Sequence, residues 1–477
     1  MDVSILQRHL ARTPPFVQQL VLNGIVAFAA SPAGQIIGLL LQLSNRLQGP
    51  HPLASPESLT NDELDKVSYE DINMLKAIPR EPTHIGYAVI GGSGFVGTYI
   101  IRLLIMRGET NIRILDLDPP PPDIAKHPSV SFVRTDITSL ASVRTGLMSQ
   151  FSSTNAPPTV IFHTAAIIRF WERVAYSWMP SYNVNVCGTD NVVAVAKDMP
   201  GGTILIYTST SDVVLPCPKF LQMGKDYDTP PWNRVIVSDQ DPPLANAQFS
   251  QSCYTKSKKL AEQIIYEANE CEGLATGILR PGQTIIGPND RMLTSTLTLP
   301  RVPIFDKNWS HTDVCVWDVA AAHLALEDAL RRRPEEVSGE AFLITGNGPA
   351  WKMQDIRHAV QHYSSKPLVF DDVNPLVIFI LAHLVEGFLF FRYYFLLPFF
   401  AVFGLRPALT PSWMGHLIYL QPTTLEYMRD VVIDDSRARN LIGYRPQWQT
   451  AQIIKYAVDE VEAGKTTGQH GLQLKHA

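Results

Sequence analysis

The sequence predicts an α/β fold built on a doubly wound parallel sheet. From Gly86 onward, short apolar segments rich in β-formers alternate with segments of helical period. The first apolar segment, Gly86–Ile90, runs directly into a glycine-rich turn and then into a helical run. The next apolar segment ends in an acid, Asp116, nineteen residues after Gly97. Strand, glycine turn, helix and terminal acid together are typical of one half of such a sheet.

The glycine-rich turn predicts a dinucleotide site. Gly91 permits the tight turn, Gly94 lets a pyrophosphate approach the backbone, and Gly97 lets the helix pack closely. The helix N-terminus offers unpaired N–H groups and a partial positive charge to phosphates. Asp116 can accept hydrogen bonds from the adenosine ribose hydroxyls, which a 2′-phosphate would repel. A ligand-free glycine turn is the alternative, but it leaves the terminal acid unexplained. We therefore expect a Rossmann-type site that prefers NAD to NADP.

The remaining elements follow the same alternation. Strands are expected at 130–133, 159–163, 203–208 and 274–279, and a late strand at 341–345 could complete the sheet. A helix is expected to open at Asn185 and continue to residue 196. The four prolines at 119–122 are expected to form an extended loop.

Composition bounds the class of protein. The chain has 477 residues, of which 45% are hydrophobic and 18% charged, with a net charge of −5. Neither the composition nor the charge pattern points to nucleic acid. Five cysteines, at 187, 217, 253, 271 and 315, show no close pairing and no metal-ligand spacing. They are expected to be reduced thiols in a cytosolic environment, and no metal is expected.

Four regions are expected along the chain. Residues 1–81 form an N-terminal extension, in which 50–76 is a polar linker with at most one helix. Residues 82–280 form the NAD-binding domain. Residues 281–465 form a smaller substrate-binding region whose late strand returns to the sheet, and 466–477 form a polar tail.

The apolar segment 16–43 allows three interpretations. Its polar residues and Pro32 weaken a transmembrane helix. The small residues at 27–30 resemble the cleavage site of a secretory signal. The third interpretation is an uncleaved interfacial anchor or a helical cap on the protein. Secretion would separate the chain from its nicotinamide pool, so we prefer an uncleaved membrane-associated segment.

The segment 375–403 is the most apolar stretch of the chain. His383, Glu386 and Arg392 interrupt it, and Pro398 is expected to kink it. A simple spanning helix would carry each charge at a cost of about 2.5–3.5 kcal/mol near the centre. An interfacial helix or a re-entrant pair avoids this cost, and a buried core helix pair is the alternative. We expect membrane contact here.

The second chemical signal is the run Tyr254-Thr255-Lys256-Ser257-Lys258. Tyr254 and Lys258 lie four apart on a predicted helix and therefore share one face. An ammonium beside the phenol favours phenolate and is expected to move the pKa of Tyr254 toward neutrality. Such a pair can take a proton from an alcohol while hydride leaves its carbon. The alternative is an ordinary exposed pair on a helix.

A hydroxyl is expected beside this pair. The strand at 203–208 leads into Ser209, Thr210 and Ser211, and ligands bind beyond the carboxyl ends of strands in a doubly wound sheet. Thr210 is preferred as the group that hydrogen-bonds the substrate oxygen, while its two neighbours stay open. Hydroxyls at strand ends often only cap the next turn.

With these motifs in order, the chain resembles the extended short-chain dehydrogenase/reductases. More narrowly, it resembles the 3β-hydroxysteroid dehydrogenase family, which includes the decarboxylating sterol-4α-carboxylate 3-dehydrogenases. The resemblance covers residues 86–443. The motifs that carry it are Gly91-Gly-Ser-Gly-Phe-Val-Gly, Asp116, Asp136, His163-Thr-Ala-Ala, Asn185-Val-Cys-Gly-Thr, Tyr207-Thr-Ser-Thr, Tyr254-Thr-Lys-Ser-Lys, Leu279-Arg-Pro-Gly, Gly287-Pro-Asn-Asp, Val316-Trp-Asp-Val-Ala-Ala-Ala-His and Leu441-Ile-Gly-Tyr-Arg-Pro.

The resemblance implies roles for individual residues. Tyr254 would be the acid/base, Lys258 its pKa partner and nicotinamide-ribose ligand, Thr210 the orienting hydroxyl, and Asn185 a residue that orders the site or its helix. The family often has Thr before the first glycine, where this chain has Ile90, so one hydrogen bond of the loop is expected to be missing. The residues implied in binding NAD are Gly91, Gly94, Phe95, Val96, Gly97, Asp116, Asp136, Ile137, Ala165 and Lys258.

The expected activity is NAD-dependent oxidation of the 3β-hydroxyl of a sterol or a sterol-like polycyclic terpenoid. A carboxylate on the adjacent carbon would make the product a β-keto acid, which loses CO₂ because the new carbonyl stabilises the enolate. The expected location is the endoplasmic reticulum membrane with the catalytic domain facing the cytosol, so the Asn308-Trp309-Ser310 sequon is expected to be unused. Besides the substrate and the membrane surface, a second copy of the chain or other sterol-pathway enzymes are candidate partners. The alternatives are an epimerase, a reductase of another carbonyl, and a non-catalytic nucleotide-binding scaffold.

Overall fold

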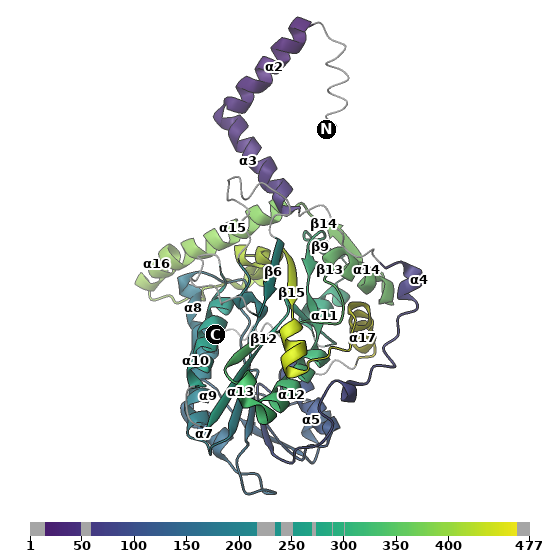
Figure 1. Ribbon diagram of the computed structural model, residues 1–477. Coiled ribbons are helices and arrows are strands. Elements are labelled where there is room, and N and C mark those ends of the chain that lie inside the picture. The colour runs from purple at the N-terminus through teal and green to yellow at the C-terminus, as the bar shows by residue number, and fades with distance from the viewer. Residues whose placement is uncertain are drawn as a thin grey trace.

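A parallel sheet forms the centre of the molecule (Figure 1). The computed structural model describes residues 15–48, 59–216, 234–239, 251–269, 273–288, 290–299 and 301–464. Within these ranges the sheet has seven strands in the order β12-β7-β5-β4-β1-β2-β3, and every neighbouring pair is parallel. They are β1 (Gly86–Ile90), β2 (Asn111–Asp116), β3 (Val130–Arg134), β4 (Val160–His163), β5 (Thr203–Thr208), β7 (Leu274–Pro281) and β12 (Glu340–Ile344). The predicted doubly wound fold is confirmed, including the late strand at the sheet edge.

Helices cover both faces of the sheet. Along β1, Tyr87 and Val89 pack into the hydrophobic core on one face, whereas Ala88 and Ile90 pack into the core on the other. The first core is closed by α5 (Phe95–Arg107) and α12 (Val316–Arg332), and the second by α7 (Leu140–Met148), α9 (Gly188–Lys197) and α10 (Cys253–Ala268). Because both faces are buried, the strands are apolar without alternation.

Shorter elements lie beyond the carboxyl ends of the strands. Four two-stranded sheets pair β10 with β13, β11 with β8, β14 with β9, and β15 with β6 within the part of the chain that the structure describes. These strands are β6 (Arg234–Ser238), β8 (Thr284–Ile286), β9 (Arg301–Ile304), β10 (Ser310–His311), β11 (Asp313–Cys315), β13 (Trp351–Lys352), β14 (Val369–Asp372) and β15 (Asp430–Asp434). The accompanying α-helices are α11 (Arg291–Thr298), α14 (Met353–Tyr363) and α17 (Thr450–Glu462), whereas α13 (Pro334–Val337) connects α12 to β12 at the amino end of the strands (Figure 1).

The N-terminal apolar segment forms two helices rather than one. α2 (Pro15–Ala30) and α3 (Pro32–Leu47) meet at Ser31, whose side chain accepts a hydrogen bond from Gly34 N at 3.1 Å. Each helix has 16 residues, or about 24 Å of length, which is less than the roughly 30 Å hydrocarbon core of a bilayer. A single spanning helix over 16–43 is therefore not formed, because Pro32 starts a new helix.

The predicted linker is packed rather than free. Residues 49–58 lie outside the described ranges, but α4 (Asn61–Leu64) and a 3₁₀ turn (Met74–Lys76) follow. Leu64 and Met74 are buried in the core on the α5 side of the sheet, and Tyr69 Oη donates to Asp459 Oδ2 at 2.9 Å. Apolar side chains at irregular spacing hold this segment, so periodicity alone did not reveal its packing.

Two predicted boundaries are corrected. Pro122 is not part of the extended loop, because it begins α6 (Pro122–Ala125). A backbone N–H at the first position of a helix has no partner within the helix, so proline costs no hydrogen bond there. Asn185 does not open a helix, since α8 (Trp178–Ser181) and a π-helical turn (Tyr182–Cys187) precede α9. Asn185 thus lies inside a π-helical turn, a feature that is frequent at functional sites.

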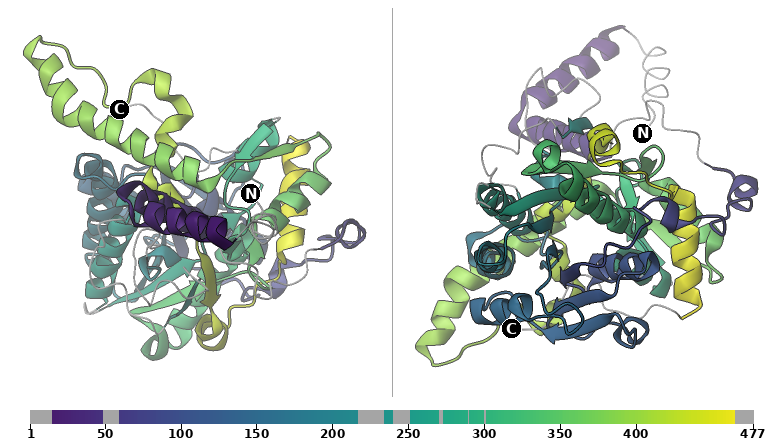
Figure 2. Two further views of the ribbon diagram at one scale, coloured as in Figure 1. Left: turned by 90° about the horizontal axis from the view of Figure 1, so that it is seen from above. Right: turned by 60° about the horizontal axis from the view of Figure 1, so that its bottom comes forward.

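The apolar C-terminal segment is one long helix in which α15 (Pro375–Phe391), a π-helical turn (Arg392–Leu396) and α16 (Leu397–Val402) follow without a gap. The π-helical turn precedes Pro398, so the predicted kink becomes a local change in helical hydrogen bonding. Among the described residues, this is the one helix long and apolar enough to cross a membrane by length and composition. Only 17% of its most apolar 18-residue window is buried, so it is not a core helix pair (Figure 2).

Candidate active site

The predicted site residues meet where β5 ends beside the N-terminus of α10. Ser252 caps α10, its Oγ accepting from Thr255 N at 3.0 Å. Tyr254 lies in the first turn of α10 and is half-buried, and Lys258 lies one turn later and is buried. Thr210, in extended backbone two residues after β5, lies beside the phenol of Tyr254 and lowers its pKa. The structure thus brings the Tyr/Lys pair to the carboxyl end of β5.

The three candidate hydroxyls behave differently. Thr210 is the one of the three that acts on the phenol of Tyr254. Its hydroxyl also donates to Asp212 Oδ2 at 3.4 Å and caps the turn of Ser211–Val213 by accepting from Asp212 N at 3.3 Å. Within the described residues, the buried hydroxyls of Ser209 and Ser211 have no hydrogen-bond partner. The geometry therefore favours Thr210 among the three.

Lys258 is held by β5. Its ammonium donates to Thr208 O at 2.7 Å and to Tyr207 Oη at 3.0 Å, and lies 4.4 Å from the centre of the Tyr207 ring. Burial lowers the pKa of Lys258 to about 7, although the nearby Glu262 carboxylate opposes the shift. An ammonium has three donors, so one stays available for a ligand. The sequence places Tyr207 in the run Tyr207-Thr-Ser-Thr but predicts no role for it.

The predicted fall in the pKa of Tyr254 is wrong for this structure. Burial raises the pKa of Tyr254, the Asp212 carboxylate raises it further, and the hydrogen bond with Thr210 only partly offsets them. The Lys258 ammonium points to Tyr207 and to the Thr208 carbonyl and is itself partly neutral near pH 7. Desolvation of the phenol, which local sequence spacing does not report, outweighs the ammonium.

Asp212 is a site residue that the sequence reasoning did not single out. Its Oδ1 accepts from Arg429 Nη2 at 2.9 Å, and Arg429 Nη1 donates to Pro216 O at 2.7 Å. The Arg429 side chain is buried and lies next to β15, far along the chain. The only sequence signal for Asp212 was its position directly after the hydroxyl residues 209–211. Nothing in the sequence indicated that Arg429 would be its partner.

Asn185 joins the loop after β4 to α10. Its Nδ2 donates to Ile167 O at 3.0 Å and to Ser257 Oγ at 2.9 Å, while its Oδ1 accepts from Ile167 N at 2.9 Å. Ser257 lies between Tyr254 and Lys258 on α10. Asn185 is thus placed to order the site, in line with the expectation for it.

The glycine loop leaves a cradle that side chains would fill. Gly91 has φ +81°, and a Cβ there would lie 2.6 Å from Ala165 N. A Cβ on Gly97 would collide with Gly91 O. Gly94 caps α5 and Phe95 is its first residue, so backbone N–H groups face the loop while the Phe95 ring packs edge-on against Tyr99. The partly buried Val96 follows in the same turn, and these features fit a bound pyrophosphate.

The glycine loop is held by a hydroxyl at the end of β4. Thr164 Oγ1 donates to Ile90 O at 2.9 Å and to Gly91 O at 3.2 Å. Ile90, which stands where the family often has Thr, is buried in the core on the α10 side and has no side-chain group that could donate to the loop.

The residues expected at the adenosine end lie at the carboxyl ends of β2 and β3. Asp116 accepts from Ser93 N at 3.0 Å and from Leu117 N at 2.7 Å, and burial raises its pKa. The backbone N–H of Asp118 acts on the same carboxylate, so about one of its roughly four lone-pair positions remains for a ribose hydroxyl. Asp136 is exposed and accepts from Thr138 N at 2.9 Å.

Ile137, also expected at the NAD site, is buried, and its carbonyl accepts from Asn191 Nδ2 at 2.9 Å. Among the residues that the structure describes, no group of three or more His, Cys, Asp or Glu could hold a metal ion. Cys187, Cys253 and Cys315 are free thiols, and the other two cysteines lie outside the described ranges.

Comparison with known proteins agrees with this geometry. A sequence model of the 3-beta hydroxysteroid dehydrogenase/isomerase family matches residues 88–364. The chain is 28% identical over 277 residues to a decarboxylating sterol-4-alpha-carboxylate 3-dehydrogenase of Candida albicans, covering 55% of this chain and 71% of that one. It is 26% identical over 411 residues to 3beta-hydroxysteroid-dehydrogenase/decarboxylase isoform 1 of Arabidopsis thaliana, covering 80% of each chain.

Two further comparisons bear on activity and fold. A 3 beta-hydroxysteroid dehydrogenase/Delta 5→4-isomerase of vaccinia virus is 27% identical over 277 residues, covering 55% of this chain and 72% of that one. The crystal structure of Thermus thermophilus UDP-glucose 4-epimerase with NAD superposes with a TM-score of 0.52 at 20% identity, covering 79% of this chain and 99% of that one. The latter likeness shows the fold alone.

The family match spans more than half of the chain, and the glycine cradle, the Tyr/Lys pair and the strand-end hydroxyl lie in the expected places within it. The prediction of an NAD-dependent oxidoreductase is confirmed at the level of the family. The chain belongs to the 3-beta hydroxysteroid dehydrogenase/isomerase family.

Proposed function

We propose that the chain oxidises the 3β-hydroxyl of a sterol or sterol-like polycyclic terpenoid, and that its substrate is a 4-carboxysterol whose 3-keto product loses CO₂. The observation that carries this proposal is the meeting of Tyr254, Thr210 and Lys258 at the end of β5 in a member of this family. Two of its relatives from a yeast and a plant are decarboxylating enzymes by name, which supports the finer substrate assignment.

NAD supplies the hydride acceptor when it is bound. The cradle formed by Gly91, Gly94 and Gly97 would hold its pyrophosphate, with backbone N–H groups of Phe95 and Val96 at the helix N-terminus. The remaining contacts would come from residues that end strands β2, β3 and β4 or lie on α10, namely Asp116, Asp136, Ile137, Ala165 and Lys258.

Three side chains of this chain handle the substrate hydroxyl. Tyr254 Oη removes its proton, and Thr210 Oγ1 holds the substrate oxygen beside Tyr254. The Lys258 ammonium, fixed by Tyr207 and Thr208, contributes positive charge that favours the phenolate of Tyr254. Asn185 keeps the helix that carries both residues against the loop after β4.

Decarboxylation then needs no further catalytic group. In the 3-keto product, the bond between C4 and the carboxylate carbon breaks and its electron pair enters the new carbonyl as an enolate. CO₂ leaves, and a proton from solvent or from Tyr254 returns to C4.

We place the enzyme at the endoplasmic reticulum membrane with its catalytic domain toward the cytosol. The apolar exposed helix of Pro375–Val402 and the lipid solubility of sterols support this location.

A product analysis tests the substrate. Full-length protein in membranes is incubated with NAD and either a 4-carboxysterol or a Δ5-3β-hydroxysterol without the carboxyl group, and products are identified by mass. We expect NADH and CO₂ from the first sterol and none from the second. A conjugated enone from the second would favour dehydrogenase/isomerase activity, as in the name of the viral relative. Isomerised substrate without net NADH would favour an epimerase.

A single substitution tests the mechanism. Tyr254→Phe removes the acid/base hydroxyl and should lower turnover by about 10²–10⁴-fold, because general acid–base catalysis contributes about that much. NAD affinity, measured by quenching of protein fluorescence, should change little. Turnover close to that of the parent protein would overturn the assigned role.

A further inference from the structure

The long helix of α15 and α16 packs on the catalytic domain along one face only. Ile378, Ala382 and Leu389 are its buried residues, and Glu386 and Tyr393 make contacts on the same side. These positions recur at intervals of three to four residues, so they form one stripe along the helix. The stripe runs from the start of the helix beyond its middle.

The contacts of this stripe reach the loop between β4 and α8. Arg173 donates to both carboxylate oxygens of Glu386, at 2.7 and 2.6 Å. The Tyr176 ring stacks on that of Tyr393 with 4.6 Å between their centres. The same loop touches α10, because Cys253 N donates to Glu172 O at 2.6 Å. This loop therefore links the apolar helix to the first turn of α10, which carries Tyr254.

The opposite face of the helix is apolar and exposed. The acidic residue and the arginine of the helix are both bound within the protein. Glu386 accepts from Arg173, and Arg392 donates to Leu409 O and to Ala408 O, each at 2.8 Å. Large apolar side chains dominate the outward surface. Those exposed are Val377, Ile380, Leu381, Leu384, Phe390, Phe391, Tyr394, Phe395, Phe399 and Val402.

The N-terminal helices lie at the same end of the molecule. Figure 1 and Figure 2 show α3 reaching the body of the protein beside α15. Leu43 and Leu47 of α3 pack with Ile378 and Ala382 of α15 in one hydrophobic cluster. The outer part of α3 is exposed and apolar at Ile36, Ile37, Leu39, Leu40 and Leu41.

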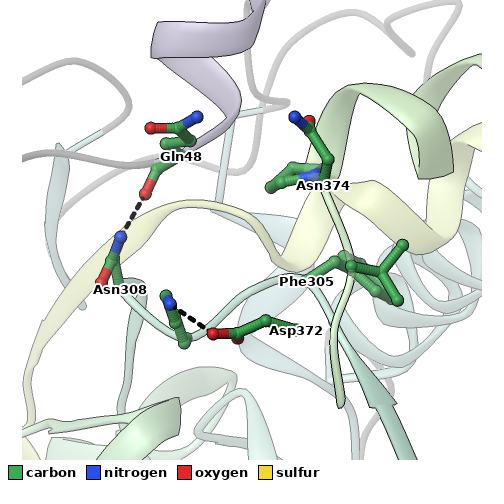
Figure 3. Close-up of a pocket in the computed structure, with 8 residues that line it drawn as sticks. Gln48, Phe305, Asn308, Asp372 and Asn374 are labelled. Atoms are coloured by element: carbon green, nitrogen blue, oxygen red, sulfur yellow. Dashed lines mark hydrogen bonds and ion pairs between the residues drawn. The ribbon is translucent and has the colours of Figure 1, made fainter. Parts of the chain in front are cut away.

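A hollow of about 260 Å³ lies at the junction of α3 and α15 (Figure 3). Polar and apolar side chains line it together, among them Gln48, Phe305 and Asn308. Lys307 and Asp372, also in its lining, pair at 2.7 Å.

We propose that α15 and α16 lie flat in the headgroup region of a phospholipid bilayer, with the outward face toward the acyl chains and α3 inserted beside them. The 28 residues would extend about 42 Å, enough to span a bilayer. Spanning is opposed by Glu386, which lies near the helix centre and is paired with the catalytic domain through Arg173. The outward face carries no acidic residue and no lysine or arginine, which fits acyl chains, and the exposed His383 and Tyr394 fit the interface.

A consequence for catalysis rests on the proposed function. With the helix in the interface, the loop that contacts both Glu386 and α10 faces the membrane. A sterol would then reach Tyr254 from the bilayer without crossing water. Docking itself does not depend on the substrate, so it can be tested without turnover.

Depth measurements on the full-length protein test the proposal. Single cysteines replace Val377, Leu384, Phe395 and Val402 in turn, and an environment-sensitive fluorophore is attached to each. The variants are mixed with phosphatidylcholine/phosphatidylserine vesicles whose lipids carry quenchers at shallow or deep positions. The parent protein, labelled in the same way, gives the background of the native cysteines. We expect shallow quenching of similar strength at all four positions.

Three results would overturn the proposal. Deepest quenching at Leu384 with shallow quenching at Val377 and Val402 would show a spanning helix. No quenching at any position would show that the bilayer does not cover this face. Fluorescence changes that depend on protein concentration without lipid, and that lipid does not alter, would assign the face to a second copy of the chain.

A charge substitution separates docking from catalysis. Leu384→Glu with Phe395→Glu should lower the vesicle-bound fraction in flotation about tenfold or more, because each carboxylate must leave the acyl region. Oxidation of sterol delivered in detergent should stay at the parental rate. Met106→Glu, at an exposed apolar position of α5, is the matched control and should float like the parent. Unchanged flotation of the double variant would contradict docking, whatever its turnover.

Discussion

Tyr254 and Asp212 set the electrostatics of the site at the scale of single residues. Desolvation of the half-buried phenol and the negative charge of Asp212 both raise the pKa of Tyr254. Arg429 Nη2 donates to Asp212 Oδ1 at 2.9 Å. The buried Lys258, with its pKa lowered to about 7, adds positive charge mainly at lower pH. The site is therefore tuned by groups on three different elements.

We predict that Asp212→Asn shifts the pH dependence of kcat/KM to lower pH. The amide removes the negative charge that raises the pKa of Tyr254, so phenolate forms at lower pH and the rising alkaline limb moves with it. Asparagine keeps an oxygen for Arg429. The measurement is the rate of NADH formation between about pH 6 and 10, a range that brackets ordinary Lys and Tyr titration.

Asp198→Asn provides the control for this shift. Asp198 forms an exposed ion pair with Arg144 on the far side of α9, and its replacement should leave the profile in place. If the Asp212 variant keeps the parental profile while Tyr254→Phe remains inactive, the proposed electrostatic coupling is refuted.

At the scale of elements, the glycine loop depends on close contact between α5, β1 and β4. Gly97 lets α5 approach the loop, and Gly91 lets the loop approach Ala165. Thr164 then binds the loop from the β4 side through the carbonyls of Ile90 and Gly91. The cradle is thus a property of three elements rather than of the glycine motif by itself.

We predict that Gly97→Ala lowers both stability and NAD affinity. The added methyl collides with Gly91 O and must push α5 away from the loop, a form of overpacking that costs about 1–3 kcal/mol. Urea unfolding and NAD titration measure the two effects. Gly201→Ala adds the same methyl where no atom lies within 4 Å and should leave NAD affinity unchanged. Equal NAD affinity in the two variants would contradict the proposal that the glycine loop holds the pyrophosphate of NAD.

At the scale of the whole molecule, a buried ionic cluster joins the N-terminal segment, the sheet and two helices. Arg107 of α5 donates to Glu109 at 2.9 Å, to Glu327 of α12 at 3.1 Å and to Tyr87 Oη of β1 at 2.7 Å. Thr83 N donates to Glu109 at 2.9 Å. The Arg107, Glu109 and Glu327 side chains are fully buried. The cluster lies at the opposite end of the strands from the proposed active site.

Arg107→Leu should destabilise the whole fold without altering the chemistry. Removing the cation leaves two buried carboxylates short of their partner, and breaking a buried pair in this way costs about 3–5 kcal/mol. Urea denaturation should show the loss, while kcat of the folded fraction should stay parental. Arg144→Leu, which breaks the exposed pair with Asp198, should change stability little. Similar losses of unfolding free energy in the two variants would show that burial of an ion pair does not set its contribution to stability in this protein.

The sequence by itself determined the elements whose signals are local. The parallel strands, the glycine turn and the four-residue spacing of Tyr254 and Lys258 are encoded by periodicity and by residue type along a short stretch. The acid at the end of β2 and the late strand β12 followed from the same alternation. These features were predictable because backbone conformation responds first to neighbouring residues.

Only the tertiary structure decided which distant groups meet. It favoured Thr210 over Ser209 and Ser211, paired Asp212 with Arg429, and brought Thr164 to the carbonyls of the glycine loop. It also raised the pKa of Tyr254 against the sequence expectation. Burial and long-range pairing set these outcomes, and both depend on packing between elements far apart in the chain, which no local pattern records.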